Sequence, residues 1–397
     1  MNEIGLYVHI PFCIRKCDYC DFLSGVFDEK TQKAYVMSLC KEIQYGGQQL
    51  RSVAVSSIYI GGGTPSWLDW DLMGQILDAI YSYFTVKEDA EISIECNPGT
   101  VTNAKFTAYR HMGINRLSIG LQSANAEELK ILGRVHDYKR FLHTFDMARK
   151  NGFDNINVDI MTGLPHQTGE KLMNTLESVI QLRPEHISAY SLIVEEGTPF
   201  FERYEEDVKR QHLGEPTINL PDEDTEYGLY KMTQRVLESH GYHQYEISNY
   251  AKEGYRCEHN VIYWKRKPYL GVGIGAASLV ENIRGTNVRD IYDYMKRCDE
   301  LQGEEELSPL WDSRIELSRY DAMEEFMFLG LRMNEGVTRE EFQKNFGCSI
   351  EGIYGNQLKK LKQEELLVLE EGRIRLTEKG TDLSNYALAH FLFEKNS

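Results

Sequence analysis

Three cysteines, Cys13, Cys17 and Cys20, lie close together near the start of the chain in a Cys-x3-Cys-x2-Cys pattern. They follow an apolar run, Ile4–Ile10, that is typical of a strand. The thiols are therefore expected on a loop at the carboxyl end of a strand, where sites of parallel barrels form. A four-iron cluster needs a ligand on each iron, so three thiolates would leave one iron open to a small molecule.

Two other chemistries use cysteines at short spacing. A zinc ion needs a fourth ligand; His9 is near in sequence, but the second Cys or His pair of a usual zinc site is missing. A redox disulfide would use only two of the three thiols. The other cysteines are scattered singly, as expected of small buried side chains in a reducing compartment: Cys40, Cys96, Cys257, Cys298 and Cys348. The pattern favours a cluster over both alternatives.

Further polar or glycine-rich positions lie near the ends of other predicted strands. Gly61-Gly62-Gly63-Thr64-Pro65 follows one strand, and three glycines in a row allow a close approach of the backbone to a ligand. Glu95, Gln122 and Asp159 lie at or near the ends of three more. In a parallel sheet these ends meet at one mouth. Acidic and amide groups there can hold the ribose hydroxyls and the ammonium group of a nucleoside-linked amino acid.

The elements that would position these residues alternate regularly between strand and helix. The predicted strands are Ile4–Ile10, Ser57–Ile60, Glu91–Cys96, Arg116–Leu121, Asn155–Ile160 and His186–Leu192. The predicted helices between them are Gln32–Gly46, Leu72–Phe84, Asn103–Met112, Tyr138–Asn151 and Gly169–Gln181. Such alternation indicates a parallel sheet with right-handed crossovers. Six units are fewer than the eight of a closed barrel, so the sequence predicts an α/β fold with a partial (β/α)6 barrel.

The chain divides into three predicted parts. Residues 1–235 form the barrel with a polar surface excursion after Glu196, residues 236–304 form a connecting segment, and residues 305–397 form a C-terminal α+β domain. In that domain the predicted helices are Tyr320–Met333, a helix capped by Thr338 with Glu341, and Ile350–Leu367. Strands Leu367–Glu370 and Arg373–Leu376 form a predicted hairpin. Three helices and a hairpin resemble a winged helix.

The charge balance restricts the partners. The chain has 44 Lys and Arg against 61 Asp and Glu, a net charge of −17. A field of that sign opposes phosphate backbones, so nucleic-acid binding is not expected. No apolar run of about 18 residues predicts a membrane span, and the first residues lack the features of a secretion signal, so the expected location is the cytoplasm. The Gly271–Ala277 segment lacks the strand–helix–strand context of a dinucleotide site.

The cysteine motif, with the aromatic Tyr19 before its last cysteine, resembles the radical-SAM signature. The string Tyr7 to Cys13 resembles the oxygen-independent coproporphyrinogen III oxidase branch of that superfamily, and the resemblance extends over nearly the whole chain. It implies a [4Fe–4S] cluster on Cys13, Cys17 and Cys20 with bound S-adenosylmethionine. It also implies that S-adenosylmethionine contacts Tyr7, the backbone of Tyr19, Gly62, Gly63, Thr64, Glu95, Gln122, Arg134 and Asp159.

Three features distinguish branches within that group. Phe22 stands where the oxidases have a fourth cysteine, and the segment before the motif is shorter than theirs. The motif from His259 to Trp264 resembles that of the HemW-type haem chaperones. This resemblance implies haem as a ligand, His259 as a haem-contacting residue, no catalytic residues, and haemoproteins, including respiratory ones, as acceptors. Two alternatives stay open: a coproporphyrinogen III dehydrogenase and a cluster-sensing winged-helix regulator.

Overall fold

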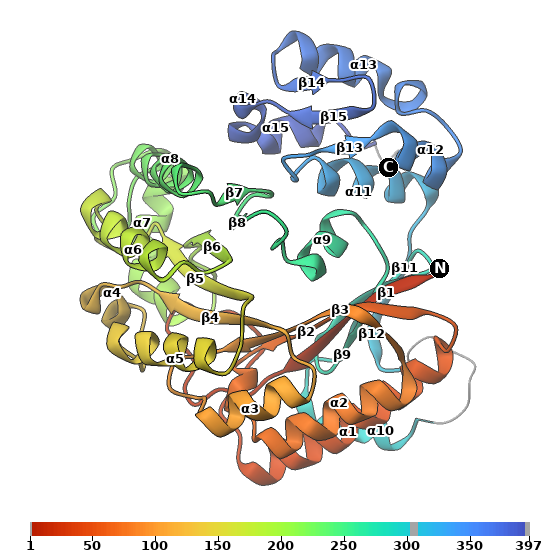
Figure 1. Cartoon of the computed structure of the whole chain (residues 1–397). Helices are drawn as coiled ribbons and strands as arrows, with labels where there is room; N and C mark the ends of the chain where they lie inside the picture. Colours follow the sequence, from red (N-terminus) through yellow and green to blue (C-terminus); the bar gives the residue numbers. More distant parts are fainter. Residues whose placement is uncertain (1, 302–308, 394–397) are drawn as a thin grey trace.

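The computed structural model describes residues 2–301 and 309–393. Six parallel strands form its central sheet in chain order (Figure 1). They are β1 (Glu3–Ile10), β2 (Ala54–Gly62), β3 (Thr85–Cys96), β4 (Arg116–Gln122), β5 (Ile156–Thr162) and β6 (His186–Ser191). The predicted six-unit α/β barrel is confirmed.

Helices connect these strands and cover the outside of the sheet (Figure 1). They are α1 (Glu29–Gln49), α2 (Trp70–Tyr83), α3 (Asn103–His111), α5 (Tyr138–Lys150) and α6 (Gly169–Leu182), and a short α4 (Ala126–Ile131) was not expected. Each of the five predicted helices begins after an Asp or Thr whose side chain accepts a hydrogen bond from a first-turn N–H, as at Asp28 and Thr102.

The barrel interior is polar because alternate residues of each strand point inward. Ile92 and Ile94 belong to the hydrophobic core between sheet and helices, whereas Glu91, Ser93 and Glu95 occupy the alternate positions. The register places these inward residues side by side, for example Glu95 opposite Ser118 on β4. Two layers follow: a deep one around Glu91 and an upper one around Glu95, near the carboxyl ends of the strands.

The segment predicted as a connector extends the sheet at both edges. Trp311–Glu316, from the predicted C-terminal part, adds a further strand, giving twelve strands among the described residues. After α7 (Pro199–Leu213) and α8 (Glu223–Ser239), β7 (His243–Gln244) and β8 (Asn249–Ala251) add antiparallel to β6. After α9 (Glu258–Trp264), strand β9 (Tyr269–Val272) pairs with β1. The elements that follow in the chain are β10 (Ala277–Val280), β11 (Ile283–Asn287), α10 (Ile291–Asp299) and β12 (Trp311–Glu316). Of these strands, β7 and β8, with two and three residues, are too short to show a period in the sequence.

The segment after Glu196 differs from the surface excursion predicted from the sequence, whereas the Gly271–Ala277 segment agrees with its prediction. The excursion after Glu196 contains the fifteen-residue helix α7, whose Phe200 and Tyr204 are buried in a small hydrophobic cluster of their own. The glycine-rich Gly271–Ala277 segment is the turn between β9 and β10. It packs on the barrel, since the Gly273 N–H donates to Glu42 on α1 at 2.7 Å and an added Cβ at Gly273 would lie 2.5 Å from the Tyr35 hydroxyl.

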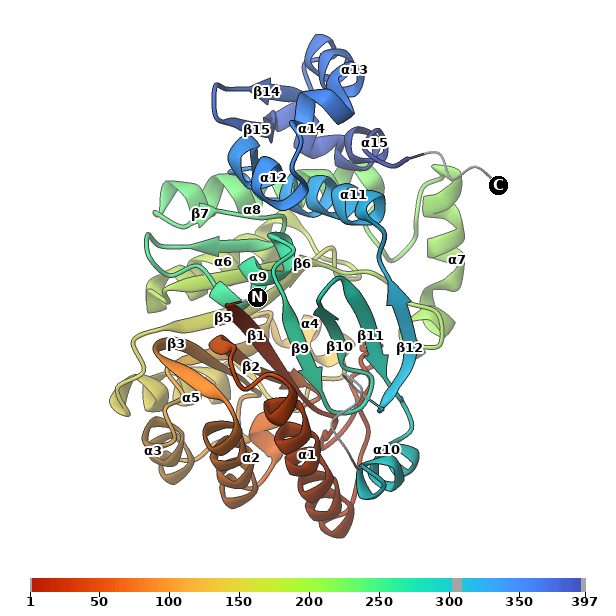
Figure 2. The ribbon, with the colours of Figure 1, turned by 90° about the vertical axis from the view of Figure 1, so that its right-hand side faces the viewer.

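The C-terminal part has its own hydrophobic core and lies above the barrel (Figure 2). It comprises α11 (Arg319–Gly330), β13 (Val337–Thr338), α12 (Arg339–Phe346), α13 (Ile350–Gln363), β14 (Leu367–Leu369), β15 (Arg373–Leu376), α14 (Glu378–Asp382) and α15 (Ser384–Ala389). The predicted helices and hairpin are present. Thr338 caps α12, but the Glu341 carboxylate accepts the Thr338 hydroxyl rather than its backbone N–H. The predicted boundary at 304/305 lies outside the described residues.

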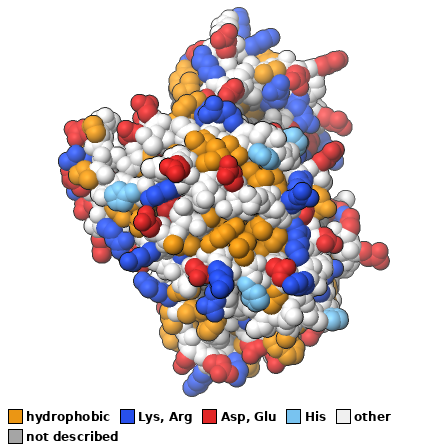
Figure 3. Space-filling view, turned by 60° about the vertical axis from the view of Figure 1, so that its left-hand side comes forward, with side chains coloured by type: hydrophobic (Ala, Val, Ile, Leu, Met, Phe, Trp, Pro, Cys, Tyr) orange, Lys and Arg blue, Asp and Glu red, His pale blue; other side chains and the backbone are white. Residues whose placement is uncertain are grey.

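None of the helices in the described residues is long and apolar enough to cross a membrane. On the face shown in Figure 3, acidic and basic side chains are interspersed around central hydrophobic patches rather than gathered by sign.

Candidate functional site

A cavity of about 490 Å³ opens at the carboxyl ends of the barrel strands, and we call it the mouth cavity. Its lining includes every site residue expected from the sequence except Tyr7 and His259: Cys13, Cys17, Tyr19, Cys20, Gly62, Gly63, Thr64, Glu95, Gln122, Arg134 and Asp159. Tyr7 lines an adjoining cavity of about 330 Å³ that shares Phe22, Gly62 and Glu95 with the mouth cavity. The structure thus brings residues from five strands and three loops to one place.

The cysteine loop between β1 and α1 is closed at its base by backbone hydrogen bonds. The Cys13 N–H donates to the Gly25 carbonyl, and the Gly25 N–H donates to the Pro11 carbonyl, both at 2.9 Å. Cys13 is buried, whereas Cys17 and Cys20 are half-buried against the cavity, and all eight cysteines of the chain are free thiols. Two side chains approach the thiols: Thr64 Oγ1 lies 3.6 Å from Cys13 Sγ, and Arg134 Nη1 lies 3.6 Å from Cys17 Sγ.

The donor set fits a cluster better than a single metal ion. Within residues 2–301 and 309–393, no three His, Cys, Asp or Glu side chains are spaced to hold one ion. Cluster thiolates bind separate irons and need not converge on one point. His9, the fourth zinc ligand considered from the sequence, is occupied: its Nε2 lies 2.8 Å from the Leu23 carbonyl and its Nδ1 3.0 Å from the Tyr7 hydroxyl.

Gly63 gives a direct test of how tightly the cysteine loop packs on the β2 loop. A Cβ at this position would lie 2.9 Å from the Phe12 carbonyl oxygen and 3.0 Å from Cys13 Sγ. We therefore expect Gly63→Ala to displace Cys13 and to lower the iron content of the anaerobically reconstituted protein by about fivefold or more, because a displaced ligand weakens metal binding. An iron assay and the absorption near 400 nm measure this loss.

The control is Gly74→Ala on α2, where the nearest atom to the added Cβ is the flexible end of Met112. This variant is expected to keep its full cluster content. Equal iron content in the two variants would show that the contact between Gly63 and Cys13 is unimportant.

Two carboxylates form the opposite wall of the mouth cavity. Glu95 accepts hydrogen bonds from the Gly62 N–H and the Tyr59 hydroxyl, both at 3.1 Å. Asp159 accepts from Ser118 Oγ at 3.0 Å and from Asn157 Nδ2 at 2.7 Å. Burial, followed by the nearby Asp159 charge, raises the pKa of Glu95 to about 7, and burial also raises the pKa of Asp159. A cationic group between them would relieve this repulsion.

Arg134 supplies the complementary charge on the cysteine side of the cavity. Its Nη2 donates to Asn97 Oδ1 at 2.6 Å and to the Gly120 carbonyl at 3.0 Å. Its Nε is buried without a hydrogen-bond partner among the described residues. A buried unpaired donor is costly, and a ligand carboxylate would satisfy it. The cavity therefore has the cation of Arg134 on one side and the carboxylates of Glu95 and Asp159 on the other. This arrangement suits a zwitterionic amino acid that carries further polar groups.

The raised pKa of Glu95 predicts a pH effect on the ligand-free protein. An unfolded Glu ionises near 4.5 and the folded Glu95 near 7, so this group's stabilisation is complete below pH 4.5 and is lost as pH rises through 7. Glu95→Gln should therefore raise the Tm at pH 8, by about 2 °C if the gain is ~1 kcal/mol, and weaken cation binding.

Thermal denaturation of both proteins between pH 5 and 8 measures this effect. Glu42, buried and also with its pKa raised to about 7, stays in both proteins, so the variant should keep part of the pH slope. A Glu95→Gln protein less stable than wild type at pH 8 would contradict the prediction.

Asn97 and Tyr59 are among the side chains of this cavity that sequence reasoning missed. Asn97 joins its two sides, donating from Nδ2 to Thr64 Oγ1 at 2.8 Å while accepting from Arg134. Tyr59 lines the cavity and donates to Glu95. The strand alternation that points Glu95 inward also points Ser57 and Tyr59 inward on β2, and this signal was available in the sequence.

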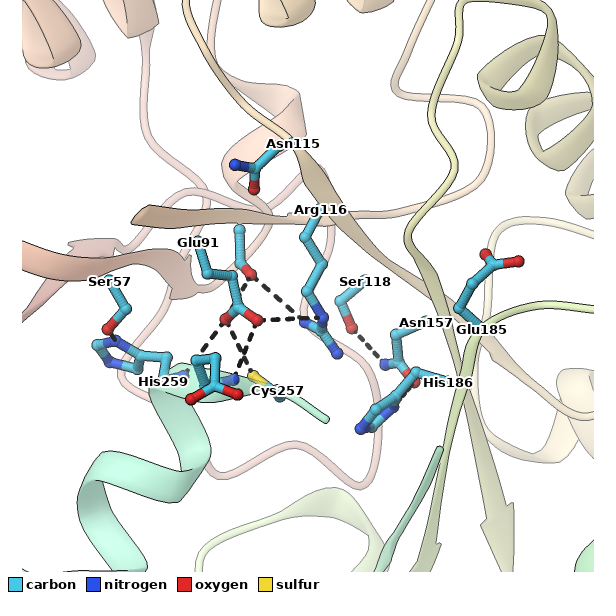
Figure 4. Close-up of polar contacts among 12 residues, drawn as sticks. Ser57, Glu91, Asn115, Arg116, Ser118, Asn157, Glu185, His186, Cys257 and His259 are labelled. Atoms are coloured by element: carbon cyan, nitrogen blue, oxygen red, sulfur yellow. Dashed lines mark hydrogen bonds and ion pairs between the residues drawn. The ribbon is translucent and has the colours of Figure 1, made fainter. Parts of the chain in front are cut away.

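His259 does not reach either cavity. It lies on α9, is 1% exposed, and is enclosed beneath β2 (Figure 4). Its Nδ1 lies 2.8 Å from Ser57 Oγ and its Nε2 lies 2.8 Å from the Tyr263 hydroxyl. Haem contact by His259 stays a prediction, and direct ligation would require this buried ring to become accessible and the hydrogen bond at the ligating nitrogen to break.

Comparisons with known proteins place this architecture in a family. Residues 7–179 match the model of the radical SAM superfamily and residues 317–383 match the HemN C-terminal domain. The heme chaperone HemW of Lactococcus lactis is 35% identical over 98% of this chain and 97% of its own length, and that of Escherichia coli is 34% identical over 99% of each.

A solved structure shares the whole fold. The structure of the coproporphyrinogen III oxidase HemN from Escherichia coli, described as a radical SAM enzyme, superposes with a TM-score of 0.82 at 24% identity, over 98% of this chain and 90% of that one. Both halves of the architecture, barrel and C-terminal part, are thus common to the two proteins. With full-length identities of this size to its relatives, the chain belongs to the HemW family of the radical SAM superfamily.

Proposed function

We propose that this protein is a haem chaperone that binds haem and delivers it to acceptor haemoproteins, including those of respiration, while carrying a [4Fe–4S] cluster and S-adenosylmethionine. The observation that carries this proposal is the full-length identity of 34–35% to proteins named heme chaperones. Phe22, which is 60% exposed at the edge of the mouth cavity, supports the chaperone over the oxidase, because the oxidases have a cysteine at that position.

In this proposal, residues of the mouth cavity and of the adjoining cavity would bind both cofactors. Cys13, Cys17 and Cys20 would hold the cluster, leaving one iron open to S-adenosylmethionine. Arg134 would pair with the ligand carboxylate, and Glu95 and Asp159 would face its cationic and hydroxyl groups. The remaining expected contacts would come from Tyr7, the Tyr19 backbone, Gly62, Gly63, Thr64 and Gln122. When bound and reduced, such a cluster supplies the electron that can cleave S-adenosylmethionine.

The wider organisation follows the same proposal. Residues 1–235 would carry the two cofactors, residues 236–304 would support the barrel with the His259–Trp264 motif, and residues 305–397 would form the winged-helix-like domain. The protein would act in the cytoplasm without binding nucleic acid, and we assign no catalytic residue. A coproporphyrinogen III dehydrogenase is the second candidate, favoured by the shared fold with HemN.

One experiment separates the two candidates. The protein is reconstituted anaerobically, then titrated with haem and, in parallel, incubated with coproporphyrinogen III, S-adenosylmethionine and a reductant. The chaperone function predicts saturable haem binding, a Soret band that shifts on transfer to an apo-haemoprotein, and no protoporphyrinogen. Turnover of coproporphyrinogen with no haem binding would refute the chaperone and establish the dehydrogenase.

A further inference from the structure

We propose that α9 is a positioning element of the S-adenosylmethionine pocket, in which His259 holds Glu95, and the start of the helix holds Asp159, from behind the cavity wall. This inference rests on the proposed binding of S-adenosylmethionine in the mouth cavity. It gives the His259–Trp264 motif a role that needs no contact between His259 and haem. The inference comes from two continuous paths of contacts that join α9 to the two carboxylates.

The first path runs through Tyr59, which has the cavity on one side and α9 on the other. Its hydroxyl donates to Glu95 Oε1 at 3.1 Å. Its ring stacks on the imidazole of His259, with ring centroids 5.4 Å apart and an interplanar angle of 28°. Any shift of the imidazole therefore moves the Tyr59 ring and, with it, the hydroxyl that orients Glu95.

His259 is itself fixed from both sides. Ser57, two residues before Tyr59 on β2, meets its Nδ1, and Tyr263, one turn later on α9, meets its Nε2. A neutral imidazole donates from one nitrogen and accepts at the other, and hydroxyl groups can serve either. Burial, and then the positive charge of Arg116, lower the pKa of His259 to about 3, so the ring stays neutral. No lone pair is left free for an iron atom.

The second path starts at Cys257, the residue before α9, and runs through buried side chains. The Cys257 N–H donates to the Tyr245 hydroxyl at 3.3 Å, and that hydroxyl lies 2.8 Å from His186 Nε2. His186 Nδ1 lies 2.6 Å from Asn157 Oδ1, and Asn157 Nδ2 donates to Asp159 Oδ1 at 2.7 Å. Because the Asn157 oxygen can only accept, His186 donates from Nδ1 and accepts at Nε2. Every donor on this path therefore points from Cys257 toward Asp159.

A buried carboxylate fixes the first turn of α9 to the barrel. Glu91 on β3 accepts the N–H of Glu258 at 3.0 Å and that of His259 at 3.3 Å, and it lies near the guanidinium of Arg116 (Figure 4). On its other side α9 packs against α11 of the C-terminal part, so the helix lies between the two parts of the chain (Figure 1). The position of Glu95 and Asp159 thus depends on the docking of one short helix.

The test compares affinities of reconstituted full-length protein for S-adenosylmethionine and for haem. Tyr59→Phe keeps the ring but removes the hydroxyl, Ser57→Ala removes the partner of Nδ1, and His259→Gln removes the stacked imidazole. Tyr242→Phe is the matched control, because the buried Tyr242 hydroxyl donates to the Pro184 carbonyl outside both paths. Affinities are measured anaerobically by calorimetry, and the haem complex by the position of its Soret band.

We expect the three path variants to weaken S-adenosylmethionine binding about tenfold, the scale of one lost hydrogen bond to a charged group. The control should stay within twofold of wild type, and the Soret position should be the same in all proteins. Unchanged S-adenosylmethionine affinity in Tyr59→Phe and Ser57→Ala, with a shifted or lost Soret band in His259→Gln alone, would overturn the inference in favour of haem ligation.

Hydrogen exchange of the wild-type protein tests the inference even if the variants fail to fold. Coupling between sites is reciprocal, so bound S-adenosylmethionine should slow amide hydrogen exchange of residues 257–264. Exchange unaffected by the ligand, while it slows around Glu95, would also overturn the inference. Protein that binds S-adenosylmethionine but no haem would refute the chaperone function alone, so the two failures are distinguishable.

Discussion

Cys17→Ala is expected to abolish the cluster chromophore of the anaerobically reconstituted protein. Two remaining thiolates cannot hold a cluster whose fourth iron has no protein ligand, because each iron needs its own ligand. The Arg134 guanidinium, now 3.6 Å from the Cys17 sulfur, would also lose its thiolate neighbour. Absorption near 400 nm and iron content should fall to the level of protein that was never reconstituted, and S-adenosylmethionine binding should be lost with them.

The matched control is Cys40→Ala, which removes a half-buried thiol on α1 from outside the cysteine loop. This variant should keep the full chromophore. A complete [4Fe–4S] spectrum in Cys17→Ala would remove the assignment of the cysteine loop, whereas loss of the spectrum in both variants would point to misfolding rather than to ligation. The wild-type cluster should bleach in air, because its open iron is accessible to small oxidants.

Arg116→Met is expected to destabilise the barrel by about 3–5 kcal/mol, the usual cost of leaving a buried charge without its partner. Arg116 is 1% exposed, and its Nε lies 3.9 Å from Glu91 Oε2. Without the guanidinium, the Glu91 carboxylate would remain deep in the barrel with no cation beside it in the deep layer. The effect should appear in thermal and urea unfolding as a lower midpoint of the transition that reports on the barrel.

Two further variants test whether the stability lost in Arg116→Met comes from its buried ion pair with Glu91. Arg149→Met removes a more exposed ion pair, in which Arg149 Nη2 lies 2.8 Å from Glu185 Oε2, and should cost about 1 kcal/mol. The double variant Glu91→Gln with Arg116→Met should recover part of the stability lost in Arg116→Met. If Arg116→Met proves no less stable than Arg149→Met, the ion pair between Arg116 and Glu91 is not the stabilising contact that its burial implies.

The fold of the barrel was predictable because its signals are local. The parallel strands carry apolar residues at alternate positions, such as Ile92 and Ile94, and each of the five predicted helices begins at an Asp or Thr cap. Both signals are visible in the sequence. The short strands β7 to β12 were not predictable, since β7 has two residues and β8 has three, and their pairing with β6 and β1 joins distant parts of the chain.

The mouth cavity was predictable for a related reason. Gln122 ends its strand, Glu95 is next to last in its own, and Asp159 lies within β5, and parallel strands bring such inward positions together. Arg134 carried no local signal, because it lies in the turn after the unexpected helix α4 and reaches the cavity only through the fold. Contact between His259 and haem stays a prediction, and the aromatic residues of its motif have other contacts in the structure. Tyr263 meets the His259 Nε2, and Trp264 packs against the cluster of Tyr245, Ala251, Val261 and Met333.

The pairing of β1 with β9 has a consequence for biosynthesis. One edge of the first strand to leave the ribosome is covered only when residues 269–272 have been made, and the outer edge of β6 waits for residues 249–251. Until then both edge strands of the nascent sheet, β1 and β6, have an unpaired edge that can pair with other chains. Release of a product truncated near residue 235 should therefore yield aggregates rather than a smaller soluble barrel, although all six parallel strands would already be present.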